Sequence, residues 1–105
     1  MTFVTVIYGR GERWDAANAF NDQIGIMGHA EFLRARYADG TLYCGGPFAD
    51  DAGGVAIYRC LDRDAVAALV ATDPCVAGGL LTAEIHPMWL PFPATTAHAT
   101  AASDT

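Results

Sequence analysis

The first strongly patterned segment is FVTVIY, residues 3–8, where nearly every side chain is β-branched or aromatic. An extended chain with apolar side chains on both of its alternating faces is typical of a strand covered on both sides. From Gly28 the pattern becomes helical, because one face recurs at intervals of three and four residues, at His29, Phe32, Leu33, Arg36 and Tyr37. Gly40 follows as a helix stop. We therefore predict a strand followed by an amphipathic helix.

The second half of the chain predicts a hairpin, a helix and a last strand. Residues 41–48 (TLYCGGPF) and 55–60 (VAIYRC) read as two strands joined by a turn at 50–54 (DDAGG). A helix is expected from an N-cap at Asp62 to about Ala71. Residues 80–90 then alternate apolar and polar side chains, which predicts the final strand.

This order of elements, strand, helix, strand, strand, helix, strand, predicts an α+β ferredoxin-like fold with a four-stranded antiparallel sheet and both helices on one face. We expect one domain over residues 1–92 and a small, polar, disordered tail over 93–105. The other face of the sheet needs a cover, and the chain has no further element to supply it. We expect a second copy of the chain to cover this face, which gives a homodimer or a higher oligomer built from such dimers.

Residues 10–27 separate the first strand from the first helix and follow no clean period. They nevertheless carry several large apolar side chains, among them Trp14 and Phe20. A loop this long in so small a domain is usually functional. We predict that it forms a lid or a pocket wall.

Composition narrows the classes of function. The 105 residues are 52% apolar and 17% charged, as in folded proteins, and a net charge of -6 without a basic cluster argues against nucleic acid and anionic membranes as partners. The first residues do not resemble a signal peptide, and no apolar run is long enough to span a bilayer, so a cytoplasmic location is expected. Cys44, Cys60 and Cys75 form no CxxC pair and are predicted to be reduced, small apolar fillers. No metal or nucleotide motif is present, so no cofactor is expected, and the only serine, Ser103, lies in the tail.

His29 and Asp73 are the residues that could carry chemistry. An imidazole has an ordinary pKa of about 6.5 and suits proton transfer, although a histidine at this position is more often a packed residue of the core edge. Its possible carboxylate partners are Asp15, Asp22, Asp39, Asp50, Asp51, Asp73 and Glu84. Asp73 followed by Pro74 is also a good N-cap for a short helical turn. The two roles of Asp73 are compatible, because one oxygen can cap the turn while the other orients an imidazole.

The segment at Gly45, Gly46 and Pro47 ends the second predicted strand. Without side chains at the glycines, either a ligand or a neighbouring backbone can approach closely, and a bulge or tight turn is the commoner explanation. Five aromatic side chains are candidates for apolar walls of a pocket: Trp14, Phe20, Phe32, Tyr43 and Phe48.

The segments GHAEFLRARYADGTLYCGGPF and DPCVAGGLLTAEIHPMWL together resemble the YCII-related family, over about Phe3 to Trp89. The resemblance implies a ferredoxin-like protomer of the dimeric α+β barrel superfamily with a cleft in each subunit. It also implies an active-site dyad of His29 and Asp73, with Gly45, Gly46 and Pro47 lining the cleft. Relatives include a dehydrochlorinase of chlorinated hydroxyhydroquinones and, more distantly, muconolactone isomerase. Where members often carry a bulky aromatic after Asp-Pro, this chain has Cys75.

Three functions follow as hypotheses. The first is a cofactor-independent lyase or isomerase in which His29 transfers a proton on a small cyclic or carbonyl compound and Asp73 fixes its tautomer. The second is a regulatory or binding module that holds a small-molecule metabolite in the same cleft without converting it. The third is a dimer in which both residues only fix helix ends.

Overall fold

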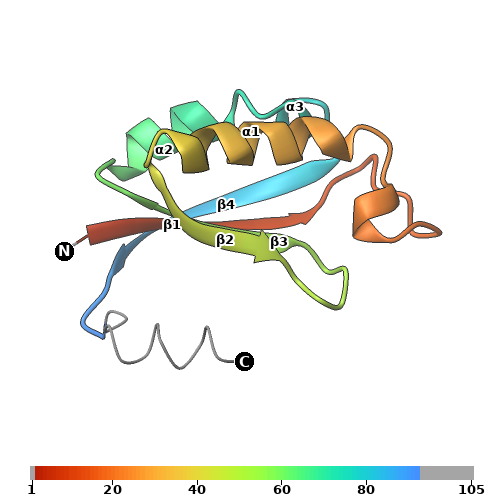
Figure 1. Ribbon diagram of the computed structural model, residues 1–105. Coiled ribbons are helices and arrows are strands. Elements are labelled where there is room, and N and C mark those ends of the chain that lie inside the picture. The colour runs from red at the N-terminus through yellow and green to blue at the C-terminus, as the bar shows by residue number, and fades with distance from the viewer. Residues whose placement is uncertain (1, 93–105) are drawn as a thin grey trace.

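The computed structural model describes residues 2–92 and is shown in Figure 1. The predicted disorder of 93–105 therefore lies outside the described residues. The elements in chain order are β1 (Thr2–Arg10), η1 (Phe20–Asp22), α1 (Ile26–Ala38), β2 (Leu42–Pro47), β3 (Gly54–Arg59), α2 (Arg63–Val70), α3 (Pro74–Ala77) and β4 (Leu81–Trp89).

The four strands form one antiparallel sheet in the order β2-β3-β1-β4. In the centre of the sheet, β1 pairs with β3 from Phe3 opposite Arg59 to Tyr8 opposite Gly54, and with β4 on its other side. The α-helices lie together over one face of this sheet (Figure 1). The predicted ferredoxin-like α+β fold, with its four-stranded antiparallel sheet, is confirmed.

The core lies between the sheet and the helices. Alternate residues of β1, namely Val4, Val6 and Tyr8, are almost fully buried on the helix side of the sheet. Val66 and Val70, one turn apart on α2, are buried in the same cluster. The buried residues of β1 are thus two positions apart and those of α2 are four positions apart, as expected for one face of a strand and one face of a helix.

The opposite face of the sheet carries the other residues of β1. Phe3 is buried there under Tyr43, with ring centroids 5.3 Å apart, and the Thr5 hydroxyl lies 3.4 Å from the sulfur of Met88. Ile7, further along the same face, is 38% exposed. Within the described part of a single chain, β1 is thus covered on one side and only partly covered on the other.

Three local predictions need correction. Helix α1 begins at Ile26, two residues before the predicted start, because Gly25 has a φ of 89° and ends the preceding loop. Tyr37 does not belong to the packed stripe and is 67% exposed. The interpretation of all three cysteines as core fillers was also wrong, since Cys44 and Cys60 are exposed and only Cys75 is buried. All three are free thiols, as predicted.

The helix caps agree with the sequence. The Asp62 carboxylate accepts a hydrogen bond of 2.8 Å from the Ala65 amide and caps α2, and Gly40, with a φ of 85°, follows α1. None of the helices within residues 2–92 is long and apolar enough to cross a membrane. The cytoplasmic location stays a prediction.

Candidate active site

The beginning of α1 packs directly against α3, and three matched pairs of residues hold the two together. The Cys75 thiol donates a hydrogen bond of 3.1 Å to the Gly25 carbonyl. A Cβ placed on Gly28 would lie 3.3 Å from the ring of Pro74, so glycine allows the close approach of the two helices. His29 follows Gly28 in α1, and Asp73 directly precedes Pro74. The approach of the two backbones therefore brings the imidazole and the carboxylate together.

His29 and Asp73 form a buried hydrogen-bonded pair. The imidazole Nδ1 lies 2.5 Å from Oδ2 of Asp73, and the two residues are 6% and 0% exposed. The second carboxylate oxygen, Oδ1, accepts a hydrogen bond of 2.9 Å from the Cys75 amide, which makes Asp73 the N-cap of α3. A buried carboxylate is costly unless its oxygens are hydrogen-bonded, and here both have a donor. Asp73 thus has both of the structural partners expected for it.

The pairing decides which nitrogen of His29 is available. Because the carboxylate accepts at Nδ1, the neutral imidazole carries its proton on that nitrogen. The lone pair is then on Nε2, and His29 lines a cavity. The arrangement leaves a proton acceptor facing the cavity, with a carboxylate behind the ring to stabilise the imidazolium once it forms.

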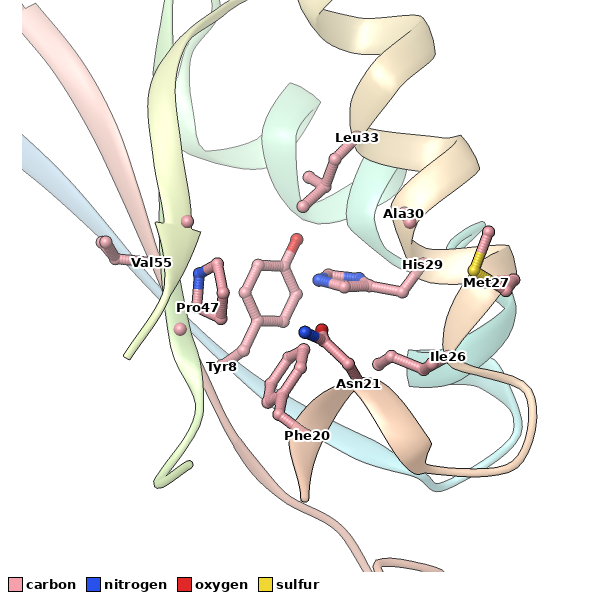
Figure 2. A pocket seen from close by; sticks show the side chains of 12 residues that line it. Tyr8, Phe20, Asn21, Ile26, Met27, His29, Ala30, Leu33, Pro47 and Val55 are labelled. Atoms are coloured by element: carbon pink, nitrogen blue, oxygen red, sulfur yellow. The ribbon is translucent and has the colours of Figure 1, made fainter. Parts of the chain in front are cut away.

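A cavity of about 220 Å³ lies beside His29, between the start of α1, the η1 turn and the β2–β3 hairpin (Figure 2). The sheet contributes Tyr8, Gly46, Pro47, Gly54 and Val55. Besides His29, the helix α1 and the loop before it contribute Phe20, Asn21, Ile26, Met27, Ala30 and Leu33 to the cavity lining. No Lys, Arg, Asp or Glu is among these lining residues, so the cavity is apolar apart from a few polar groups. Its volume suits a molecule with a single ring, since it is smaller than pockets for drug-sized ligands.

The structure places the predicted wall residues differently. Phe20, Gly46 and Pro47 line the cavity. Gly45 does not, and a Cβ there would lie 2.5 Å from the Val55 carbonyl, so this glycine accommodates the neighbouring strand. Phe48 is 39% exposed at the hairpin turn.

The remaining predicted wall residues lie outside the cavity lining. Trp14 packs against the Phe20 ring, with centroids 5.6 Å apart, and so supports the wall from behind. The guanidinium of Arg36 lies over the ring of Phe32, 5.6 Å from its centroid. Tyr43 covers Phe3 on the other face of the sheet.

Sequence reasoning missed two polar lining residues, Tyr8 and Asn21. The Tyr8 ring meets the His29 ring edge to face, with centroids 4.7 Å apart and an interplanar angle of 75°. Its position in the first strand gave the only available signal, because Tyr8 shares the inward face with Val4 and Val6. Asn21 lies on η1, a turn for which the sequence of the 10–27 loop gives no periodic signal.

Two buried tyrosines stand beside the dyad. Tyr8 and Tyr58 are 2% and 0% exposed, and within residues 2–92 neither hydroxyl has a hydrogen-bond partner. They lie close enough for each hydroxyl to affect the pKa of the other. Burial raises the pKa of Tyr58 to about 12, and burial, with Tyr58 and Asp73 adding to it, raises the pKa of Tyr8. Both hydroxyls therefore stay protonated throughout the neutral range.

This burial predicts alkaline sensitivity. The tyrosine pKa is raised by folding, so the folded chain binds more protons than the unfolded chain between pH 10 and about 12, and stability is lost as the pH rises through this window. For Tyr58 alone the loss is on the order of 2–3 kcal/mol. Urea unfolding at several pH values should show a shallower loss in Tyr58→Phe, whereas Tyr37→Phe, at an exposed position, should retain the wild-type profile. Identical profiles in all three proteins would contradict the prediction.

In the part of the chain that the structure describes, no group of three or more His, Cys, Asp or Glu side chains is placed to hold a metal ion. Burial also raises the pKa of the Cys75 thiol, which suits its role as a hydrogen-bond donor to Gly25. Among the side chains that line the cavity, the imidazole of His29 is therefore the candidate for proton transfer.

The model of the YCII-related domain matches residues 1–88. The chain belongs to the YCII-related family. None of the curated proteins matches it. The match to the YCII-related domain spans both His29 and Asp73.

A solved structure with a similar fold is 5-chloro-2-hydroxyhydroquinone dehydrochlorinase (TftG) from Burkholderia phenoliruptrix AC1100, in complex with 2,5-dihydroxybenzoquinone. The TM-score is 0.54 and the sequence identity is 22%, with 85% of this chain and 93% of that chain covered. At this identity the likeness shows the shared α+β fold.

Proposed function

We propose that this YCII-related protein is a cofactor-independent lyase or isomerase that moves a proton on a small cyclic or carbonyl compound. The observation that carries the proposal is the His29 imidazole, which lines an apolar cavity while its Nδ1 is held by the buried Asp73 carboxylate. A buried histidine oriented by a carboxylate, with its second nitrogen toward a ligand-sized space, is the arrangement expected of a general base.

The chemistry would run through Nε2. In the first step this nitrogen accepts a proton from the bound compound, and Asp73 stabilises the resulting imidazolium, an interaction that the apolar surroundings strengthen. In an isomerisation the same proton returns to another atom of the compound. In an elimination the electron pair left behind expels a leaving group such as chloride, and the proton later passes to solvent. Asp73 acts in both cases as a positioning residue.

The cavity limits the class of substrate. Its lining offers no fixed cation to a carboxylate or a phosphate, and its volume of about 220 Å³ fits one ring with small substituents. These properties favour a quinone, a hydroxylated ring or a lactone. The similarly folded TftG is a dehydrochlorinase whose structure holds 2,5-dihydroxybenzoquinone, and this supports a lyase reaction on such a ring.

The test is turnover by the purified protein without added metal or cofactor. The panel should contain 5-chloro-2-hydroxyhydroquinone, unchlorinated hydroxylated rings and small unsaturated lactones, followed by chloride release and by absorbance of the ring. Product formation on one member is the expected result. A compound that binds at one molecule per chain and is recovered unchanged would instead favour a metabolite-binding or regulatory module. Absence of both would leave His29 and Asp73 with a structural role.

We also propose that the protein is a homodimer that pairs the open faces of its two sheets. The apolar side chains of this face support the proposal: Ile7 is 38% exposed opposite Val55, and Phe3 lies opposite Met88 further along β1. Sedimentation should give a dimer for the wild type and for Ile24→Glu, whose position is 91% exposed on the 10–27 loop. Ile7→Glu should shift the protein toward monomer, because a carboxylate would be buried between the sheets. A monomeric wild type would contradict the proposal.

A further inference from the structure

The tip of the β2–β3 hairpin reaches the loop that closes the cavity. Oδ1 of Asp51, in this tip, accepts a hydrogen bond of 3.1 Å from the amide of Phe20, the first residue of η1. The Asp51 carbonyl accepts two further bonds from the Arg10 side chain, of 3.3 and 3.0 Å, at the end of β1. Asp51 therefore connects the hairpin to η1 and to the end of β1, and all three of these segments contribute residues to the cavity lining.

Asp51 supplies the side-chain hydrogen-bond acceptor that the residue before η1 does not provide. The residue at the N-cap position of η1, Ala19, makes no side-chain hydrogen bond to the turn. A carboxylate 31 residues away satisfies the first amide instead. Gln23 is a buried polar residue of the 10–27 loop, and its side-chain amide forms hydrogen bonds with the backbone of Asp15 and Asn18 in the same loop. The bond from Asp51 ties the turn to the hairpin.

The η1 turn carries two residues of the cavity wall. Phe20 is 6% exposed and packs 6.4 Å from the His29 ring, centroid to centroid. Figure 2 shows the Asn21 side chain on η1, beside Phe20 and on the same side of the cavity as Ile26. Asn21 and His29 are polar groups on different elements, and a ligand that contacts both has a fixed orientation only if η1 is fixed relative to α1.

We propose that Asp51 is a positioning residue for the site: it holds η1 in place, and thereby sets Phe20 and Asn21 against the ligand that His29 acts on. The inference rests on the proposed function of the cavity. Asn21 would then recognise a carbonyl oxygen or a hydroxyl group of the ring compound, because its side-chain amide can both donate and accept hydrogen bonds.

A purely local role for Asp51 makes a different prediction. Asp51 has a φ of 62°, a conformation that Asn, Asp and Gly tolerate best. If the turn needs only this conformation, Asp51→Gly should be harmless. If the carboxylate bond matters, Asp51→Gly should fail and Asp51→Asn, which keeps an acceptor oxygen, should restore the function. Asp50→Gly is the matched control, because Asp50 lies in the same turn and its carboxylate, among residues 2–92, bonds only to the nearby Ala52 amide.

The experiment combines amide hydrogen exchange of residues 10–27 with titration of 2,5-dihydroxybenzoquinone as the probe. We expect Asp51→Gly to speed exchange at Phe20 and to raise the Kd by about fivefold, the effect of losing one capping bond. Asp51→Asn and Asp50→Gly should stay within about twofold of the wild type by the same measure.

The outcomes separate the inference from the proposed function. If the wild type binds the probe and Asp51→Gly matches it in exchange or in Kd, the inference is overturned and the proposed site stands. If Asp50→Gly is impaired as strongly as Asp51→Gly, the turn and not the carboxylate bond is responsible, and the inference is again overturned. A wild type that binds neither this probe nor any member of the turnover panel overturns the proposed site together with the inference.

Discussion

His29→Ala is expected to lower kcat/KM of the proposed reaction by about 10²- to 10⁴-fold, the usual contribution of a general acid or base. The imidazole is the proton acceptor that faces the cavity, and alanine removes it while leaving the apolar lining in place. The measurement is the initial rate on the compound that the panel identifies, with folding checked by circular dichroism.

Asp73→Asn tests the same mechanism at the carboxylate that is hydrogen-bonded to His29. The amide can still cap α3 through its oxygen, but it does not stabilise an imidazolium as a carboxylate does. We expect most of the activity to be lost, and the double variant with His29→Ala to be little worse than His29→Ala alone, because the two residues act as a unit. Full activity in His29→Ala would exclude the mechanism.

Asp73→Ala is expected to have the largest effect on stability, lowering the free energy of unfolding by about 2–5 kcal/mol. The substitution leaves two buried donors, Nδ1 of His29 and the Cys75 amide, without their acceptor. It also leaves a space in a fully buried part of the molecule. Chemical denaturation followed by fluorescence measures the change.

Asp62→Ala is the matched control for this stability prediction. Asp62 caps α2 with a similar bond, but its carboxylate is at an exposed position and makes no bond to an imidazole. Its removal should cost about 1 kcal/mol, as for an ordinary cap. If Asp73→Ala costs no more than Asp62→Ala, the buried pair adds nothing to stability and Asp73 is only a cap.

Much of the fold could be predicted because it depends on local patterns. Alternation along β4 and the spacing of Val66 and Val70 in α2 specify which face of each of these elements is buried. The cap at Asp62 and the short turn begun by Asp73 and Pro74 were predictable for the same reason, since a cap joins residues two or three positions apart. The start of α1 was misplaced because Ile26 and Met27 belong equally well to an apolar loop and to a helix.

The site was predictable only in part. His29 and Asp73 were singled out by residue type and by the resemblance to a family, but their bond spans 44 positions of the chain. It depends on the contact of Gly28 with Pro74, which neither local pattern indicates. Tyr8 could be found only through its place on the inward face of the first strand. Asn21 and the hydrogen bond from Phe20 to Asp51 had no signal that sequence reasoning could use, because they depend on where a loop and a hairpin tip lie.

The sequence by itself determined the order of the elements, the buried faces of α2 and β4 and the residues able to carry a proton. The reason is that periodicity and capping act over a few residues. The tertiary structure decided that one of seven candidate carboxylates pairs with His29, which ring nitrogen remains for a ligand, and that the neighbouring cavity is apolar. These properties arise from distances between segments far apart in the chain, and such distances are fixed only when the helices pack on the sheet.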